Sequence, residues 1–201
     1  MRTAKSPSRV SKFASASATN AKSMPSESNE IGTAHRMYSL VLRPPKYEWF
    51  GLTDLSRHPP RRCYDETLGG GAGLARMVDK YRALHGCSLG DYWAGEDSGF
   101  DKSILEFLGL DSSEFSQAVE TSDSEDALLN SLSNCLVRKS VEEKTGFNNK
   151  LLTMGPDNDQ QLTFFREAIR DLDPKRRELK SWAALTILDD QISFARLKVG
   201  I

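Results

Sequence analysis

The chain has 201 residues, with 27 Lys and Arg against 28 Asp and Glu and a formal net charge of -1 at pH 7. This length allows one domain, or one domain with a tail, because a typical domain takes roughly 100–200 residues. The balanced charge and a pI near 6.3 exclude a strongly basic protein, so we expect neither nucleic acid nor a membrane surface as partner. No stretch approaches the ~18 consecutive apolar residues that a membrane span requires.

Three cysteines, Cys63, Cys87 and Cys135, lie far apart in the sequence. Their odd number and the absence of Cys-x-x-Cys spacing predict neither a disulfide framework nor a zinc site, and the three histidines are not spaced as metal ligands either. We therefore expect buried or half-buried thiols in a reducing compartment, which indicates an intracellular protein of the cytoplasm or of an organelle. No metal site and no cofactor motif is predicted.

Residues 1–35 form a tail with almost nothing to bury. Serine and alanine predominate, and five basic residues precede the first acid, Glu27. This composition is typical of a transit peptide for a mitochondrion or a plastid. It is equally that of a disordered extension, because so few apolar residues cannot offset the entropy of the chain. Both interpretations stay open.

Residues 36–67 are expected to form an extended arm. Residues 38–42 have the composition of one short strand, and the proline pairs at 44–45 and 59–60 favour polyproline II over helix. The arm also carries several cations, among them Arg61 and Arg62, which can meet phosphate but are more commonly solvated. We expect the arm to lie across a helical body.

From Leu68 onward the apolar residues recur at helical spacing, which predicts a mainly α fold of about six to seven short helices in residues 68–201. Gly86 stands where a left-handed cap would end the first helix. Capping-box patterns begin at Asp111 and Ser140, and Asp173 with its following proline indicates the start of the last helix. The expected helices cover about residues 74–86, 101–108, 111–119, 128–136, 140–152, 162–172 and 174–185. The stripes on these helices predict a core that includes Met77, Tyr81, Leu132, Phe165, Ile169 and Trp182.

A glycine-rich run at residues 69–73 precedes the first helix. It lacks the Gly-Lys-Ser/Thr ending of a P-loop and the third glycine of a dinucleotide fingerprint, and no strand leads into it. A flexible loop before a helix still leaves backbone N–H groups for an anion in principle. A turn that needs positive φ is the simpler interpretation.

The first helix carries its charges opposite its apolar stripe. Asp79 has Arg76 three residues before it and Arg82 three residues after it, with Lys80 adjacent. In solvent these residues would form an ordinary salt-bridged face; covered by another element, they would form a polar site for an anion or a proton transfer. Spacing alone favours the solvated face. The acids at 189–190 are likewise interpreted as surface acids.

Several segments together resemble a known family. They are the run from Leu55 to Arg62 (Leu-Ser-Arg-His-Pro-Pro-Arg-Arg), the block from Leu74 to Lys80 (Leu-Ala-Arg-Met-Val-Asp-Lys) and residues 88–92 and 101–111. In this order they are similar to the mostly bacterial family filed as domain of unknown function 5069. The similarity covers about residues 52–190, and its most specific part is the block from Leu74 to Lys80. Members of that family are small single domains with no established reaction, so the resemblance supports the boundaries of the domain more than a function.

The resemblance also implies that a set of polar residues gathers in one site. Where the family tends to have a Cys-Pro-Leu-Asp turn, this chain has Ser98 through Asp101, which keeps the acid and puts cysteine chemistry at this turn in doubt. No residue is assigned a catalytic role. The candidate ligand-binding residues are Arg62, Arg76, Asp79, Lys80, Arg82, Tyr92 and Asp101.

Two functions of different classes remain. The first is binding of a small anionic ligand, with or without its conversion, at this cluster. In this hypothesis Asp79 is covered, Arg62 and Asp101 join it, and surplus positive charge attracts the ligand. The alternative is a protein–protein interaction module without catalytic activity, for which an exposed apolar patch would be the sign.

Deleting residues 1–30 is expected to leave the cooperative thermal melt of the protein unchanged, because that segment offers almost no apolar surface to a core. Limited proteolysis of the full chain should yield a stable fragment beginning near residues 30–50. A reporter fused to the tail separates the two interpretations, since a transit peptide directs it to an organelle and a plain extension leaves it cytosolic. A large drop in the melting temperature after the deletion would show that the tail belongs to the fold.

Overall fold

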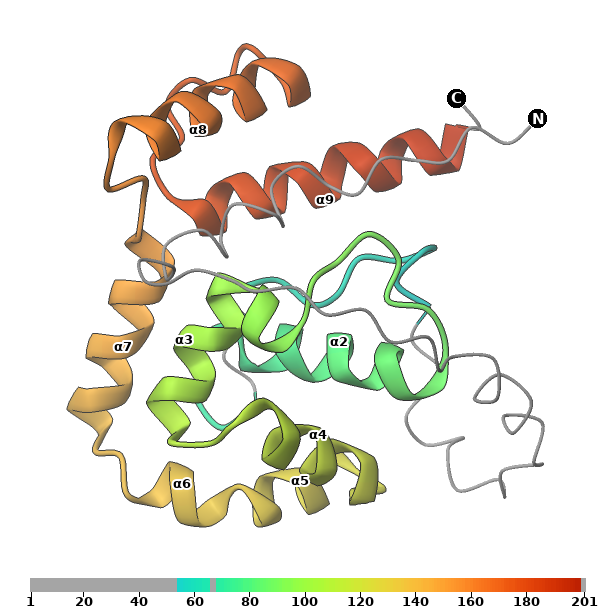
Figure 1. The fold of residues 1–201 in the computed structure, drawn as a ribbon, viewed down its shortest axis with the longest axis vertical. Helices are drawn as coiled ribbons and strands as arrows, with labels where there is room; N and C mark the ends of the chain where they lie inside the picture. Colours follow the sequence, from blue (N-terminus) through green and yellow to red (C-terminus); the bar gives the residue numbers. More distant parts are fainter. Residues whose placement is uncertain (1–53, 66–67, 200–201) are drawn as a thin grey trace, which may run out of the picture.

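The computed structural model describes residues 54–65 and 68–199, and within these ranges the protein is helical and contains no strand. The mainly α fold is thus confirmed, while the strand expected at 38–42 and the tail lie outside the described residues. Figure 1 shows α2 near the centre, with α9 on one side and α4 and α5 on the other. The elements are α2 (Leu74–Gly86), the 3-10 helix η3 (Gly95–Asp97), α3 (Gly99–Leu108), α4 (Ser112–Thr121), α5 (Glu125–Ser131), α6 (Ser133–Val137), α7 (Val141–Thr153), α8 (Asp159–Leu172) and α9 (Trp182–Val199).

Most helix starts agree with the sequence signals. Both predicted capping boxes are present, at Asp111 before α4 and at Ser140 before α7, where each cap side chain accepts a backbone hydrogen bond and the glutamate three residues later returns one. The single helix expected over 128–136 is wrong, because it divides at Leu132 into α5 and α6. Eight α-helices therefore occupy the described part of the chain, against the six or seven expected.

Two helix ends differ from the sequence signals. Gly86 is the last residue of α2 and is not in the left-handed region; Cys87 closes the helix instead, with its N–H donating to Ala83. Asp173 ends α8 and does not begin α9, because its carboxylate accepts the N–H of Lys175 in a turn, at 3.0 Å. The last helix begins only at Trp182.

The core surrounds α2. Every residue from 71 to 80 is buried, and α2 packs against both α3 and α4, while α9 packs against α7 and α8. The six residues predicted from their helical stripes are all buried, which confirms that part of the prediction. They are Met77, Tyr81, Leu132, Phe165, Ile169 and Trp182.

Residues 54–65, the described part of the arm, lie against α2. Leu55 and Cys63 are buried, and their backbones are tied down: the Leu55 N–H donates to the Ser88 carbonyl, and the Cys63 carbonyl accepts from the N–H of Gly73, both at 2.9 Å. Gly90 adopts a φ of +63°, and a Cβ there would lie 2.7 Å from the Leu55 carbonyl oxygen. The arm can approach this closely only because residue 90 is glycine.

The glycine run before α2 is a turn, as its simpler interpretation predicted. Gly69, Gly70 and Gly73 have positive φ. The side chain of Asn148, on α7, accepts the Ala72 N–H at 2.8 Å and donates to the Gly70 carbonyl at 2.9 Å. Amides that an anion would need are therefore engaged inside the protein, and the anion-binding interpretation of this loop is not supported.

Two glycine substitutions on either side of the α7 C-terminus should have opposite effects. A Cβ at Gly155 would collide with the carbonyl oxygen of Lys180, so Gly155→Ala is expected to lower the free energy of unfolding by about 1–3 kcal/mol. Gly146, within α7, has open space around its Cβ position, so Gly146→Ala should raise that free energy by up to about 1 kcal/mol. Denaturant unfolding of both variants checks this. Equal stabilities would contradict the close approach at Gly155.

Candidate functional site

The charged face of α2 is buried. Arg76 is 4% exposed, Asp79 7% and Lys80 3%, so the solvated face favoured by spacing alone is wrong. The arm, the segment from η3 to α3, and α9 all contribute partners to these residues. The partner residues lie 18, 21 and 114 residues along the chain from Asp79, Lys80 and Arg76, well beyond the i±3 and i±4 neighbours of a helix, so helical spacing holds no sign of them.

Arg76 pairs with an acid from the far end of the chain. Its guanidinium donates to both carboxylate oxygens of Asp190 on α9, at 2.7 and 3.2 Å, and the Tyr92 hydroxyl donates to the same carboxylate at 2.6 Å. The guanidinium also lies over the Tyr92 ring, 5.2 Å from its centre. Burial opposes the charged guanidinium, but the charge and hydrogen bonds of Asp190, together with contributions from Cys63 and Tyr92, outweigh that effect and raise the pKa of Arg76. Asp190 is 7% exposed, so its interpretation as a surface acid is wrong.

Lys80 pairs with Asp101 at the start of α3. Its ammonium group donates to the Asp101 carboxylate at 2.5 Å, to the Trp93 carbonyl at 3.0 Å and to the Ser98 hydroxyl at 3.2 Å, which uses all three donors. Burial lowers the pKa of Lys80 and raises that of Asp101, because each charge is removed from water, and the facing charge offsets part of each shift. Ser98 also caps α3, so the hydroxyl at this turn has a structural use.

Asp79 is covered as predicted, but by a different partner. Its carboxylate accepts from the backbone N–H of Arg61 at 2.8 Å and from the Arg61 guanidinium, through Nη2 at 2.8 Å and Nε at 3.1 Å. Arg61 also reaches Glu125 at 2.8 Å, which Arg82 contacts at 3.5 Å. Burial lowers the pKa of Arg82 to about 10, although Glu125 and Asp79 oppose this. Arg61, and not Arg76 or Arg82, makes the direct ion pair with Asp79, so the expected arrangement is wrong. Arg76 pairs with Asp190, and Arg82 pairs with Glu125. Arg62 is exposed.

The positive charges of this cluster are balanced. Each of its four cations faces a carboxylate, so the surplus positive charge expected around Asp79 is wrong for the described residues. Coverage and neutrality together indicate a structural role, because an added anion would have to compete with carboxylates already in contact. We call this set the buried ion-pair cluster; its cations are Arg61, Arg76, Lys80 and Arg82, and its acids are Asp79, Asp101, Glu125 and Asp190.

The thiols do not add a nucleophile to this cluster. Cys63 is fully buried beside it, and burial raises the pKa of the thiol, which keeps it protonated. Cys135 is half-buried, as expected, whereas Cys87 is exposed because it follows directly on the last turn of α2. Among the described residues, no group of three or more His, Cys, Asp or Glu side chains is placed to hold a metal ion.

A first cavity, which we call the arm hollow, measures about 590 Å³ beside α2. Arg62 and Asp79 are the two predicted site residues that line it. Arg61 is there as well, while Asp65 and Asp79 supply two acids, so the two cations of the hollow are matched by two carboxylates. The complete lining is Pro59, Pro60, Arg61, Arg62, Tyr64, Asp65 and Asp79.

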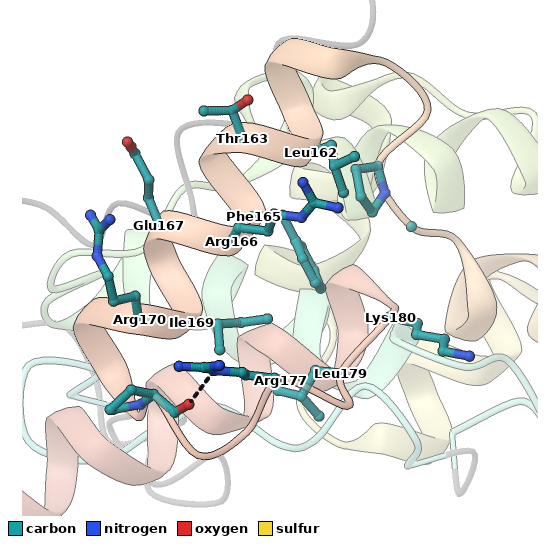
Figure 2. A pocket seen from close by; sticks show the side chains of 13 residues that line it. Leu162, Thr163, Phe165, Arg166, Glu167, Ile169, Arg170, Arg177, Leu179 and Lys180 are labelled. Atoms are coloured by element: carbon teal, nitrogen blue, oxygen red, sulfur yellow. Dashed lines mark hydrogen bonds between the residues drawn. The ribbon is translucent and has the colours of Figure 1, made fainter.

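A second and larger cavity of about 800 Å³ lies between α8 and residues 174–180 (Figure 2). We call it the α8 groove. Figure 2 shows the side chains of Leu162, Phe165 and Ile169 on the side of α8 that faces the loop carrying Arg177 and Leu179. Near the rim stand four cations, with Glu167 as the one acid. The cations are Arg166, Arg170, Arg177 and Lys180.

The walls of the α8 groove are held in place by specific contacts. The Arg177 Nε donates to the Pro174 carbonyl at 3.1 Å, which fixes the loop, and Phe165 meets the ring of Trp182 edge-on at 5.1 Å. The backbone N–H of Trp182 donates to the Met154 carbonyl at 2.9 Å. Sequence reasoning missed this groove, although Arg166 and Arg170 at i and i+4 beside an apolar stripe were a visible signal.

No helix in the described part of the chain is both long enough and apolar enough to cross a membrane.

Substitutions in the pair of Lys80 and Asp101 test the buried ion-pair cluster. Lys80→Met or Asp101→Leu alone should lower the free energy of unfolding by about 3–5 kcal/mol, since each leaves an uncompensated buried charge. The double variant should lose clearly less than the sum, because it removes both charges together. As a control, Glu178→Gln breaks the exposed pair with Arg176 and should leave the free energy of unfolding nearly unchanged. Additive single effects in denaturant unfolding would contradict the coupling.

Comparison with known proteins agrees with the resemblance found in the sequence. A search of curated proteins gave no match. Residues 57–192 match the model of a family described as "Domain of unknown function (DUF5069)". The match spans more than half of the chain, and it includes both the buried ion-pair cluster and the α8 groove. The protein therefore belongs to the DUF5069 family.

Proposed function

We propose that the protein binds a small anionic molecule in the α8 groove. The observation that carries the proposal is the charge of that groove, whose lining includes four cations and one acid around a space of about 800 Å³. Binding sites for small molecules typically have volumes of about 300–1,000 Å³. The proposal keeps the class of ligand that the sequence indicated and moves the site from α2 to α8.

The buried ion-pair cluster is a weaker candidate for the same ligand. Its two most buried cations, Arg76 and Lys80, are bonded to carboxylates, and an entering anion would have to displace Asp190 or Asp101 from contacts of 2.7 and 2.5 Å. Arg166 and Arg177 are exposed at the groove and can meet an anion without the loss of a buried pair. A group of accessible positive charges also raises the local concentration of an anionic ligand.

The groove supports binding and gives no support for conversion of the ligand. None of the residues that line it is a histidine, cysteine or serine. The lining therefore lacks a histidine, the side chain whose ordinary pKa suits a general base near pH 7, and it lacks a thiol nucleophile. Its polar side chains other than the cations are Thr163 and Glu167, and Figure 2 shows Glu167 directed away from the loop. We therefore propose a binding protein.

The protein–protein interaction module remains as the second candidate because of two exposed valines. Val137, at the end of α6, is 81% exposed, and Val141, at the start of α7, is 75% exposed. Two small side chains cover less area than the roughly 300–600 Å² of a typical functional patch. The α8 groove is accordingly the better supported site.

Thermal shift measurements with inorganic phosphate, pyrophosphate and citrate test the proposal on the full chain. At least one anion should raise the melting temperature above that in sodium chloride of equal ionic strength, because a ligand of the folded state stabilises it by mass action. Arg166→Gln with Arg177→Gln should remove the shift. The melting temperature without ligand should fall slightly, because Arg177→Gln also removes the hydrogen bond from Nε to the Pro174 carbonyl.

Arg62→Gln is the matched control, since it removes an exposed arginine of the arm hollow and leaves the α8 groove intact. This variant should keep the full shift. A shift that disappears in Arg62→Gln and survives in the groove variant would assign the anion to the arm hollow and overturn the proposal. A shift in none of the three anions would count against it in the same way.

A further inference from the structure

The α8 groove has an apolar floor below its charged rim. Phe165 and Ile169 are 3% and 5% exposed, and Leu162 and Leu179 are half-buried. Figure 2 shows Leu162, Phe165 and Ile169 together on the inner side of α8, opposite Leu179. The rings of Pro156 and Pro174 also belong to the lining. A wholly polar metabolite would leave this floor without a matching surface.

The four cations of the groove lie nearer to solvent than the apolar residues of its floor. All four are exposed, so their charged groups remain in water. Figure 2 shows Arg166 directed toward the loop, whereas Arg170 lies on the same side of α8 as Glu167 and also pairs with Asp171 at 3.7 Å. One wall is set by α8, which carries Arg166 and Arg170 one turn apart; the other is set by the loop with Arg177. The site therefore offers charge at its rim and apolar contact in its depth.

From this arrangement we infer that the ligand is an amphipathic anion, a free small molecule with one carboxylate or phosphate group attached to an apolar chain or ring. The anionic group stays near the guanidinium groups, and the apolar part lies on Leu162, Phe165, Ile169 and Leu179. The inference rests on the proposed function, because it names the class of anion that the same groove binds.

The two parts of such a ligand contribute differently to affinity. Exposed guanidinium groups hold an anion weakly, because water and salt screen the charge. Each buried methylene group adds about fourfold to the binding constant, by conversion of the usual transfer free energy. Both parts should therefore contribute to affinity: the apolar part adds to it with each buried methylene group, and the charge selects an anion over a cation with the same chain.

Isothermal titration calorimetry of the full chain with octanoate, acetate and octylammonium tests the inference. Octanoate and acetate share the charge and differ in the chain, whereas octanoate and octylammonium share the chain and differ in the charge. We expect octanoate to bind at least ~10-fold more tightly than acetate, since burial of even two methylene groups gives about that factor. Octylammonium should bind at least ~10-fold more weakly than octanoate, because like charges repel at the rim.

Substitutions separate the floor from the rim. Leu179→Asn, at a half-buried position of the loop, should reduce the affinity for octanoate toward that for acetate and leave the affinity for acetate unchanged. Arg166→Gln should weaken both anions. Circular dichroism checks that each variant is folded, and Leu162→Asn on α8 replaces Leu179→Asn if the loop variant does not fold.

The outcomes distinguish this inference from the proposed function. Equal affinities for octanoate and acetate would overturn the amphipathic ligand and keep the anion site, whereas no binding of octanoate, acetate or the phosphate-containing anions would overturn both. Equal affinities for octanoate and octylammonium would also overturn the inference. An anionic lipid has the same chemistry as such a ligand, so sedimentation with phosphatidylglycerol vesicles is included. Binding to vesicles that Leu179→Asn abolishes would assign the groove to a lipid surface and overturn the free ligand.

Discussion

The structure depends on the cost of taking the pairs Arg76–Asp190 and Lys80–Asp101 out of water around one helix, with Asp79 largely buried against Arg61 beside them. An unpaired charge in a protein interior costs on the order of several kcal/mol, even after the protein around it has relaxed. Each buried charge must therefore meet its partner with good geometry. Lys80 meets this condition with three hydrogen bonds, and Arg76 meets it through both oxygens of one carboxylate. Any arrangement of the chain that separates these partners is therefore strongly disfavoured, which makes the pairs a constraint on the whole fold.

The partners come from four separate segments of the described chain. Arg61 belongs to the arm, Asp101 to α3, Glu125 to α5 and Asp190 to α9, and all of them converge on α2. Apolar burial supplies the main driving force for collapse but is not directional. The ion pairs have fixed geometry, so they set the position of the arm and of α9 against α2. We regard the buried ion-pair cluster as the frame of the domain, and the neutral balance of its charges as the reason why it offers little to an anion.

The α8 groove has the opposite electrostatic character. It lies at the end of the domain where α8 and the loop before α9 stand apart from α2 (Figure 1), and its cations remain in water. Contacts of Phe165 with Trp182 and of the Gly155 backbone with Lys180 keep its walls together. A rigid site with accessible charge can bind a ligand without a loss of folding energy, which is the physical basis for placing function at α8 and structure at α2.

The sequence by itself determined the local features of this protein, whereas only the tertiary structure decided which charges pair. Helical spacing predicted the all-α fold and the buried positions of Phe165 and Trp182, and the capping boxes at Asp111 and Ser140 predicted two helix starts, because these signals arise within a few residues of one another. The residues around Leu132 and Asp173 were less predictable, since a turn there competes with helix at similar local energy.

Of the candidate site, the sequence and the resemblance indicated that Arg76, Asp79, Lys80, Tyr92 and Asp101 belong together. Arg61 lies 18 residues along the chain from its partner Asp79, and Asp190 lies 114 residues from its partner Arg76. Contacts at such separations depend on how whole elements pack, and no local pattern on α2 records which carboxylate or guanidinium will arrive to cover it.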